Sequence, residues 1–311
     1  MRSKSILVVA IVLMTTGVSP AVTMDWVTVG DAGNNADATG YGGVGYEYQL
    51  GKYEVTNSQY CEFLTAVAAT DTYGLYNTNM ASGYENTGGI IRSGSSGSYT
   101  YAVRTGRGSN PVKYVNWYNS LRFANWLHNG QPTGQQNDLT TEDGAYDMDG
   151  DLTTHKSNAL AWLPTEDEWY KAAYYKAGGT NAGYWNYATQ SNLCPTRETP
   201  PGGENSANYN WIVGGLTDVG AYIASDSAYG TFDQNGNLWE WNEAWFDLAP
   251  VVRGSSWRCD ASGMPASYRL NTYGYNSEDE STVGFRVASV PEPSTLLLLG
   301  LGGVMLRRKR S

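Results

Sequence analysis

Three stretches of this chain carry both a start signal and the apolar spacing of an α-helix, and these positions limit the folds open to it. The first follows a capping box in which Thr56 is the N-cap and Gln59 the third helical residue. The second follows Asn116, and the third follows Thr165, whose capping-box partner is Glu168. Apolar residues at helical spacing after each signal predict three amphipathic helices.

The rest of the chain predicts short strands and long irregular connections. Apolar and aromatic residues predict strands over residues 27–29 and 46–53, and helical periodicity is lost after residue 176. The chain holds 37 Gly, 24 Tyr and 11 Trp, so we expect many loops and a core packed with aromatic rings. No Pro- or Ser-rich linker divides residues 25–289. The sequence therefore predicts one α+β domain, rich in irregular structure, over that range.

The charge balance restricts the partners. Thirty acidic and 20 basic side chains give a formal charge of −10. This charge disfavours anionic surfaces, and we expect no nucleic-acid partner. The many Trp and Tyr rings also leave sugar binding through exposed rings as an alternative to a purely structural role.

The first 24 residues have the order of a secretory signal peptide. Arg2 and Lys4 form a basic start, residues 6–14 are apolar, and residues 19–21 (Ser-Pro-Ala) resemble a cleavage site. A membrane helix is the alternative, but the apolar run is short for a span. We therefore expect the mature chain to begin near residues 22–25 and to be exported.

The last 22 residues, 290–311, form a second processing signal. A Pro-Glu-Pro motif at residues 291–293 precedes an apolar segment at 296–306 and a basic cluster at 307–310. This order resembles the PEP-CTERM sorting signal that exosortases recognise. The resemblance implies an exosortase-type partner and transient inner-membrane anchoring through 296–306. It also implies delivery to the cell surface or extracellular matrix.

Three cysteines in an exported chain leave an odd one. If Cys61 and Cys194 pair, Cys259 remains a free thiol. Cys61 also falls on a predicted helix face, so a buried, unpaired thiol is the alternative there.

Motifs of several other functions are incomplete. Residues 40–45 fit G-x-G-x-x-G by spacing, but they lead into a predicted strand, so we interpret them as a flexible loop. Residues 147–151 alternate Asp like a calcium loop but lack its Gly position and bidentate Glu, which favours a solvated acidic turn. His128 and His155 are too few for a histidine metal triad.

Five ordered motifs resemble those of the formylglycine-generating, or sulfatase-modifying factor, family. The resemblance covers nearly all of residues 25–289 and implies that family's variant of the C-type-lectin-like fold. The motifs are G-K-Y-E-V-T-N at 51–57, P-V through W at 111–117, L-P-T-E with E-W at 163–169, G-N-L-W-E-W at 236–241, and R-G-x-S-W at 253–257 with G-F-R at 284–286.

The resemblance assigns catalytic positions to the loop after residue 253. Active members of the family use O₂ and copper(I), held by two cysteines, to oxidise a sulfatase cysteine within C-x-P-x-R. Cys259 matches the first cysteine and Ser256 a nearby polar residue, but Met264 stands where the second cysteine is expected. A neutral thioether binds copper(I) more weakly than a thiolate does. An incidental loop thiol is therefore the alternative role for Cys259.

The family also carries calcium, and the resemblance implies a structural calcium here. One implied site comprises Asn208, Tyr209, Gly220 and Tyr222, and the other comprises Asn237, Leu238 and Glu240. Oxygen ligands suit this hard cation. Copper is expected only if the protein is catalytically active.

Our leading sequence hypothesis is an exported, surface-sorted member of this family that serves as a non-catalytic binding or structural module. Its ligand would be a surface polymer or a protein. One alternative is a copper-dependent formylglycine-generating oxidase acting on exported sulfatases, and another is a carbohydrate-binding surface protein.

Overall fold

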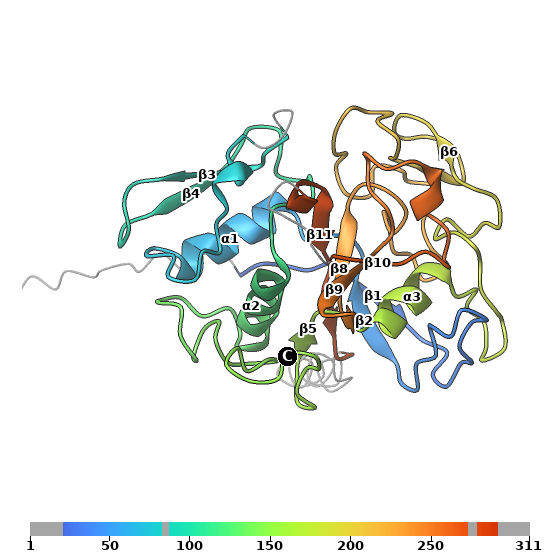
Figure 1. Cartoon of the computed structure of the whole chain (residues 1–311), viewed down its shortest axis with the longest axis horizontal. Helices are drawn as coiled ribbons and strands as arrows, with labels where there is room; N and C mark the ends of the chain where they lie inside the picture. The colour runs from blue at the N-terminus through green and yellow to red at the C-terminus, as the bar shows by residue number, and fades with distance from the viewer. Residues whose placement is uncertain (1–20, 83–86, 273–278, 292–311) are drawn as a thin grey trace, which may run out of the picture.

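A computed structural model describes residues 21–82, 87–272 and 279–291. The central strands separate two halves of the molecule (Figure 1). Helices α1 (Asn57–Val67) and α2 (Trp117–His128) lie on one side with the hairpin of β3 (Ile90–Ser93) and β4 (Thr100–Val103). Helix α3 (Glu166–Tyr174) and long loops lie on the other side.

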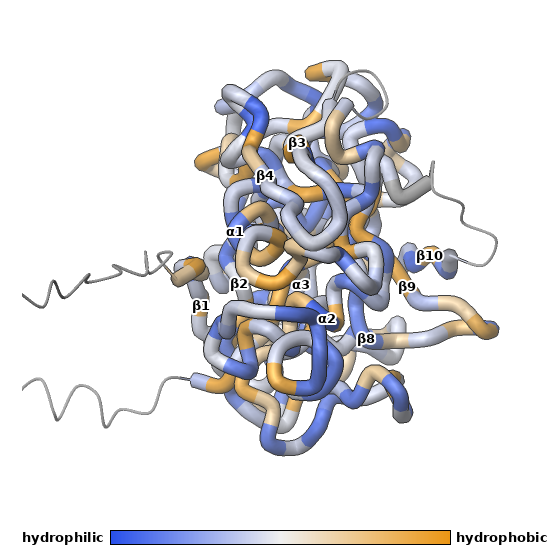
Figure 2. Tube along the Cα trace, turned by 90° about the vertical axis from the view of Figure 1, so that its left-hand side faces the viewer, coloured by the Kyte–Doolittle hydropathy of each residue, from blue (hydrophilic) through white to orange (hydrophobic). Residues whose placement is uncertain are grey.

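Two four-stranded sheets form the centre of the fold. The first has the order β1 (Trp26–Val29), β2 (Tyr48–Gly51), β12 (Ala288–Ser289) and β5 (Ala161–Trp162). The second has the order β10 (Leu270–Asn271), β9 (Ala249–Arg253), β8 (Trp239–Phe246) and β11 (Val283–Phe285). β11 pairs with β8 in parallel, whereas β8 and β9 form an antiparallel hairpin. This hairpin extends away from the body and ends in an apolar tip (Figure 2).

The remaining elements are short. β6 (Thr196–Arg197) pairs in parallel with β7 (Ser206–Ala207). The 3₁₀ turns are η1 (Thr78–Met80), η3 (Ala261–Gly263) and η4 (Asp279–Thr282). In the described part of the chain no α-helix follows α3, and the predicted α+β class with extensive irregular structure is confirmed.

The three predicted helix starts are confirmed in atomic detail. Thr56 and Thr165 each accept a hydrogen bond from the third helical N–H, and the Gln59 and Glu168 side chains accept one from the N-cap N–H. Asn116 caps α2 by accepting from the Asn119 N–H. The strand predicted over residues 46–53 is shorter, because β2 spans only Tyr48–Gly51. Beyond Gly51 the chain leaves the ladder, and the Lys52 N–H bonds to the Asp25 carbonyl.

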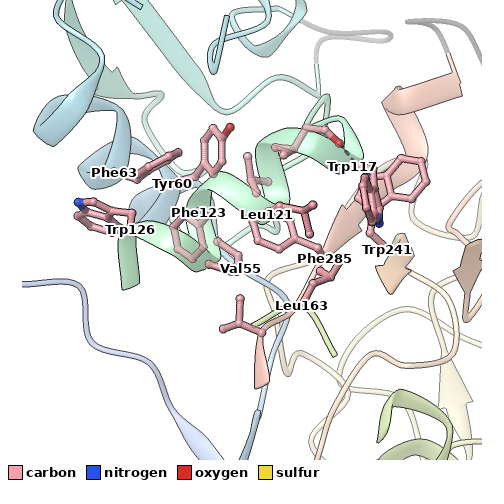
Figure 3. Packing of buried hydrophobic residues seen from close by; sticks show 14 of the residues in the cluster. Val55, Tyr60, Phe63, Trp117, Leu121, Phe123, Trp126, Leu163, Trp241 and Phe285 are labelled. Carbon is pink, nitrogen blue, oxygen red and sulfur yellow. Dashed lines mark hydrogen bonds between the residues drawn. The ribbon is translucent and has the colours of Figure 1, made fainter. Parts of the chain in front are cut away.

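The largest core cluster is aromatic, as the composition predicts. It lies between α1, α2 and the second sheet (Figure 3). The Phe123 ring packs edge-on against Phe63 and Phe285, with centroids 5.3 and 5.4 Å apart. Such pairs contribute about 0.5–1.5 kcal/mol each beyond the area they bury.

A buried ionic network joins the two sheets. Arg286 and Glu240 are both fully buried, and the guanidinium Nε and Nη2 donate to the two carboxylate oxygens at 2.6 and 2.7 Å. Arg286 also donates to the Gly51 carbonyl at the end of β2. Because β11 lies beside β8, the G-F-R and W-E-W motifs meet in space across 46 residues of sequence.

Within the described ranges no helix is long and apolar enough to cross a membrane. Residues 1–20 of the predicted signal peptide (1–24) and the apolar segment 296–306 lie outside these ranges.

Candidate functional site

The loop that follows β9 holds the predicted catalytic residues, and its backbone is fixed at both ends. Gly254 has a φ of 98°, and a Cβ there would lie 2.9 Å from the Gln234 carbonyl, so a side chain is excluded on two grounds. Further along, the Trp257 N–H bonds to the Asn237 carbonyl, and the Trp257 side chain is fully buried. The loop therefore presents Ser256 and Cys259 from a rigid base.

Cys259 is partly exposed and has two polar neighbours. The Trp239 indole Nε1 donates to its sulfur at 3.3 Å, and the Ser256 hydroxyl lies 3.3 Å from the same sulfur. The structure therefore brings Cys259 and Ser256 together, as the family resemblance implies.

Met264 occupies a different environment. Its side chain is fully buried in a small cluster with Ala207 and Tyr209, whereas Cys259 packs against the main core. The two sulfurs thus belong to separate packing clusters. Met264 is a neutral thioether enclosed by apolar side chains, so this pair lacks the second thiolate that active family members use to hold copper(I).

The first implied calcium site offers one free buried oxygen. The Asn208 side-chain amide donates to the Gly215 carbonyl and to Asn237, but its Oδ1 has no hydrogen-bond partner. A buried acceptor without a donor is costly, and a cation would satisfy it. The backbone N–H of Gly220 donates to the Asp233 carboxylate at 2.6 Å, so a carboxylate lies beside this residue of the implied site. Tyr209 and Tyr222 use their hydroxyls to bond the carbonyls of Pro195 and Glu198.

In the second implied calcium site the side-chain oxygens are already engaged in hydrogen bonds. Both oxygens of Glu240 accept hydrogen bonds from Arg286, and one also accepts from the Trp169 indole. The Asn237 Oδ1 accepts from Thr217 and Asn208. The Leu238 N–H is bonded to Glu54. These side-chain oxygens face donors, so they have little capacity left for calcium.

The structure also gives the state of the three cysteines and the position of the acidic turn. All three cysteines are free thiols, with Cys61 buried and Cys194 exposed. Asp147, Asp149 and Asp151 lie in an exposed turn, as predicted. In the ranges that the structure describes, no group of three or more His, Cys, Asp or Glu side chains has the arrangement of a metal site.

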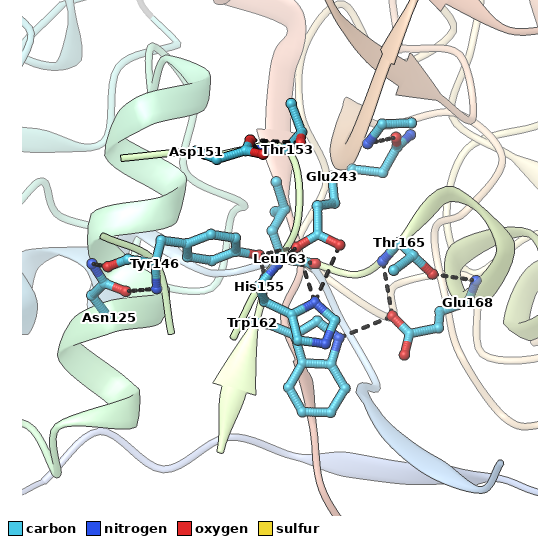
Figure 4. Close-up of polar contacts among 12 residues, drawn as sticks. Asn125, Tyr146, Asp151, Thr153, His155, Trp162, Leu163, Thr165, Glu168 and Glu243 are labelled. Carbon is cyan, nitrogen blue, oxygen red and sulfur yellow. Dashed lines mark hydrogen bonds and ion pairs between the residues drawn. The ribbon is translucent and has the colours of Figure 1, made fainter. Parts of the chain in front are cut away.

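The sequence did not predict a polar cluster around Glu243. The Glu243 carboxylate accepts hydrogen bonds from the Tyr146 hydroxyl at 2.9 Å and from the His155 ring at 2.9 Å (Figure 4). The His155 ring stacks on Trp162 with centroids 4.8 Å apart. Burial opposes protonation of His155, but the hydrogen bond and charge of Glu243 outweigh it and raise the pKa of the imidazole. No local signal joins residues 88 positions apart, so only the fold reveals this pair.

The fold resembles that of a solved structure, Treponema denticola variable protein 1. The TM-score is 0.53 and the identity 21%, over 86% of this chain and 95% of that protein. At this identity the likeness establishes the fold class alone.

The sulfatase-modifying factor enzyme 1-like domain model matches residues 33–290, so the chain belongs to that family. Two similar curated proteins are the inactive C-alpha-formylglycine-generating enzyme 2 of Mus musculus, 33% identical over 138 residues, and that of Bos taurus, 32% identical over 138 residues. These matches cover 41% of this chain and 42% and 43% of the mouse and bovine proteins. The chain therefore spans about two fifths of the length of these relatives.

A PEP-CTERM protein-sorting motif matches residues 289–310. This confirms the predicted sorting signal and indicates export with recognition by exosortase-type machinery. The family domain ends where the motif begins, and the last described strand, β12, lies in the first sheet beside β5. The sorting segment thus leaves the domain from a paired strand.

Proposed function

We propose that this chain is an exported, surface-sorted member of the family that acts as a binding or structural module without formylglycine-generating activity. The observation that carries the proposal is that only one of the two expected metal ligands is a thiol. Cys259 is a single thiol beside Trp239, and Met264 is enclosed in another cluster. Both curated relatives are named inactive enzymes, which is consistent with loss of the oxidase chemistry in this branch.

A peptide assay tests this proposal. The full-length chain, kept in mild detergent, is incubated with copper(I), O₂ and a C-x-P-x-R peptide, and the aldehyde is sought by mass spectrometry. We expect no aldehyde above the level of the Cys259→Ser variant. Aldehyde that forms with the native chain and disappears in Cys259→Ser would overturn the proposal and establish the oxidase alternative.

The sorting route is part of the same proposal. The PEP-CTERM match supports exosortase recognition, transient inner-membrane anchoring through residues 296–306, and release to the cell surface or extracellular matrix. Fractionation of cells tests it, because a chain without residues 291–310 should lose its surface location. An unchanged distribution of the truncated chain would contradict this route.

We also propose a structural calcium at Asn208, supported by its free buried Oδ1. Asn208, with oxygen atoms of Tyr209, Gly220 and Tyr222, would hold the ion. Added calcium should raise the melting temperature, and a chelator should lower it. Asn208→Leu should abolish the calcium response, whereas Asn129→Leu, which also removes a side-chain amide that bonds carbonyl groups, should retain it. Equal calcium responses in the native and Asn208→Leu chains would exclude this site.

Carbohydrate binding is the second candidate function. It is favoured by the partial exposure of several aromatic rings, including Tyr46 at 49% and Trp211 at 39%. Exposed rings of this kind can cover the apolar face of a sugar. A glycan array, read with and without calcium, tests it, and the absence of any signal would remove this candidate.

A further inference from the structure

Both ends of the described domain lie at the C-terminal end of α2. The Val22 N–H donates to the side-chain oxygen of Gln131, just beyond α2, at 2.6 Å. The Gln131 amide donates in turn to the Val22 carbonyl at 2.9 Å. At the other end of the chain, the Val290 N–H donates to the Leu160 carbonyl, and the Leu160 N–H donates to the ring of His128, the last residue of α2. The chain therefore enters and leaves the domain in one region.

These two ends carry the two processing segments. The apolar run of the predicted signal peptide ends at residue 14, and Val22 follows eight positions later. The apolar segment of the sorting signal begins at residue 296, six positions after Val290. An extended chain spans at most about 3.6 Å per residue, so these connections reach about 29 and 22 Å. A domain of this length is roughly 45 Å across, so a membrane that holds either segment lies on the α2 side.

Exposed apolar side chains flank the same helix end. Leu160 is 54% exposed, although both of its backbone groups are hydrogen-bonded. Leu139 is 80% exposed, and the carbonyl of the next residue, Thr140, accepts a hydrogen bond from Asn129, the C-cap of α2. Val290 is 37% exposed. We call Leu139, Leu160 and Val290 the α2-end face. Apolar side chains this open to water gain free energy when they enter a lipid interface.

The charged groups near the α2-end face do not favour an anionic surface. Lys156 is paired with Asp143. Asp138, next to Leu139, is exposed, and the acidic turn of residues 147–151 lies in the same long connection. Negative and balanced charge weakens the contact with anionic lipid. A contact of this face with a membrane therefore depends on its apolar side chains and suits zwitterionic headgroups.

A protein partner fits the α2-end face less well than a lipid surface does. Three side chains provide far less area than the roughly 1,200 Å² that a stable protein–protein interface buries. A membrane needs no matching pocket, and a short connection to an inserted segment holds the face at a high effective concentration near the lipid. A contact too weak to recruit a free chain can therefore form in an anchored one.

We propose that the α2-end face rests on the lipid surface of the inner membrane while the chain is anchored there. The proposal rests on the transient anchoring given above and adds the orientation of the domain. The Pro-Glu-Pro motif begins one residue after Val290. This orientation therefore brings the start of the motif to the membrane surface, where the sorting machinery would act on it.

Hydroxyl-radical footprinting of the full-length chain in phosphatidylcholine vesicles tests this orientation, with the oxidation of each leucine read by mass spectrometry. Leu193 is the matched reference for Leu139, because it is 76% exposed and precedes β6, which lies in the other half of the molecule (Figure 1). Similar exposure predicts similar oxidation rates when neither leucine contacts lipid. We expect Leu139 to react at least about threefold more slowly than Leu193, because interfacial burial by about 5–10 Å removes most of its contact with water.

Two changes test the cause of this protection. Leu139→Asp combined with Leu160→Asp places charge in the face, so Val290 should react faster than in the native chain. Leu193→Asp adds the same charge elsewhere on the surface and should leave the rate of Val290 unchanged. Vesicles enriched in phosphatidylglycerol should protect Leu139 less, since the chain carries a formal charge of −10.

Flotation of the vesicles separates failure of this proposal from failure of the anchoring. A chain that floats with the vesicles while Leu139 and Leu193 react at equal rates would overturn the orientation alone. Val290 protection that survives the double substitution, or stronger protection of Leu139 on anionic vesicles, would also overturn it. A full-length chain that does not float would contradict the anchoring and this orientation together.

Discussion

Replacement of Arg286 by methionine should remove a large part of the stability of this domain. The guanidinium is fully buried and bonds both oxygens of Glu240, which is itself fully buried. It also donates to the carbonyls of Gly51 and Phe232 at 2.9 and 2.8 Å. Methionine has a similar length and apolar packing, so the change isolates the charge and the five-donor fork of arginine.

The expected cost follows from what Arg286→Met leaves behind. Removing one partner of a buried ion pair typically costs about 3–5 kcal/mol, because the other charge stays buried and unpaired. Each carbonyl left without a donor adds roughly 1 kcal/mol or more. Burial and nearby carboxylates raise the pKa of Glu54 and bring that of Asp233 to about 6, so loss of Arg286 would take its charge away from three buried acidic groups, Glu54, Asp233 and Glu240. We expect a loss of about 5 kcal/mol, compared with a total stability of roughly 5–15 kcal/mol for a folded domain.

Urea unfolding followed by tryptophan fluorescence measures this loss. Arg286→Lys keeps the positive charge but lacks the planar set of guanidinium donors, and it should lose about 2–3 kcal/mol of unfolding free energy. This variant gives a measurable loss even if Arg286→Met does not fold. Arg197 is an exposed arginine whose side chain bonds the Asn210 carbonyl, so Arg197→Met is the matched control and should change stability by less than about 0.5 kcal/mol. A loss below about 1 kcal/mol in Arg286→Met would refute the reasoning.

Three further predictions concern other polar groups. Thr165→Ala removes the N-cap of α3 and should cost about 1 kcal/mol in urea unfolding, whereas no loss would show that the cap is dispensable. Burial lowers the pKa of Lys171 to about 8. The charged ammonium therefore destabilises the folded state below about pH 8, and this loss of stability becomes smaller as the pH rises toward 10. Lys171→Met should therefore raise the melting temperature at pH 7 relative to the native chain, with a smaller gain at pH 10; a clear loss at pH 7 would contradict this. Because the folded pKa of His155 is raised, its pairing with Glu243 stabilises most below about pH 6.5 and less as the pH rises through the folded value. His155→Gln should lose more stability at pH 5.5 than at pH 8.5, and equal losses would argue against a charged pair.

The features that the sequence predicted well are local ones. A capping box depends on residues three positions apart, so Thr56 and Thr165 announce their helices without knowledge of the fold. Strand ends are less local. β2 stops at Gly51 because its neighbours in space, β1 and β12, end there, and no residue within 46–53 encodes that limit.

The site was predicted only in part, for the same physical reason. Sequence spacing aligned Met264 with a metal ligand, but spacing does not say which side of the loop a side chain enters. That choice is made by Ala207 and Tyr209, which come from a distant segment and enclose the thioether. The two polar neighbours of Cys259 differ in the same respect. Ser256 is three residues away in the sequence, whereas Trp239 comes from β8 and is brought close only by the fold.

The family signature and the family chemistry are physically separable in this chain. The signature residues Arg286 and Glu240 form a buried ion pair, and Gly254 permits a backbone approach that excludes a Cβ. Gly284 has a similar role, because a Cβ there would lie 2.8 Å from the Val112 carbonyl. These residues are required for the two sheets to pack, whichever sulfur occupies position 264. Selection for the fold alone would therefore preserve the recognisable motifs, whereas the residue at position 264 could change without loss of these contacts. This separation is consistent with the proposed non-catalytic role, because the fold keeps its family motifs while position 264 holds an apolar thioether, and it directs the search for a binding site to other surfaces of the same fold.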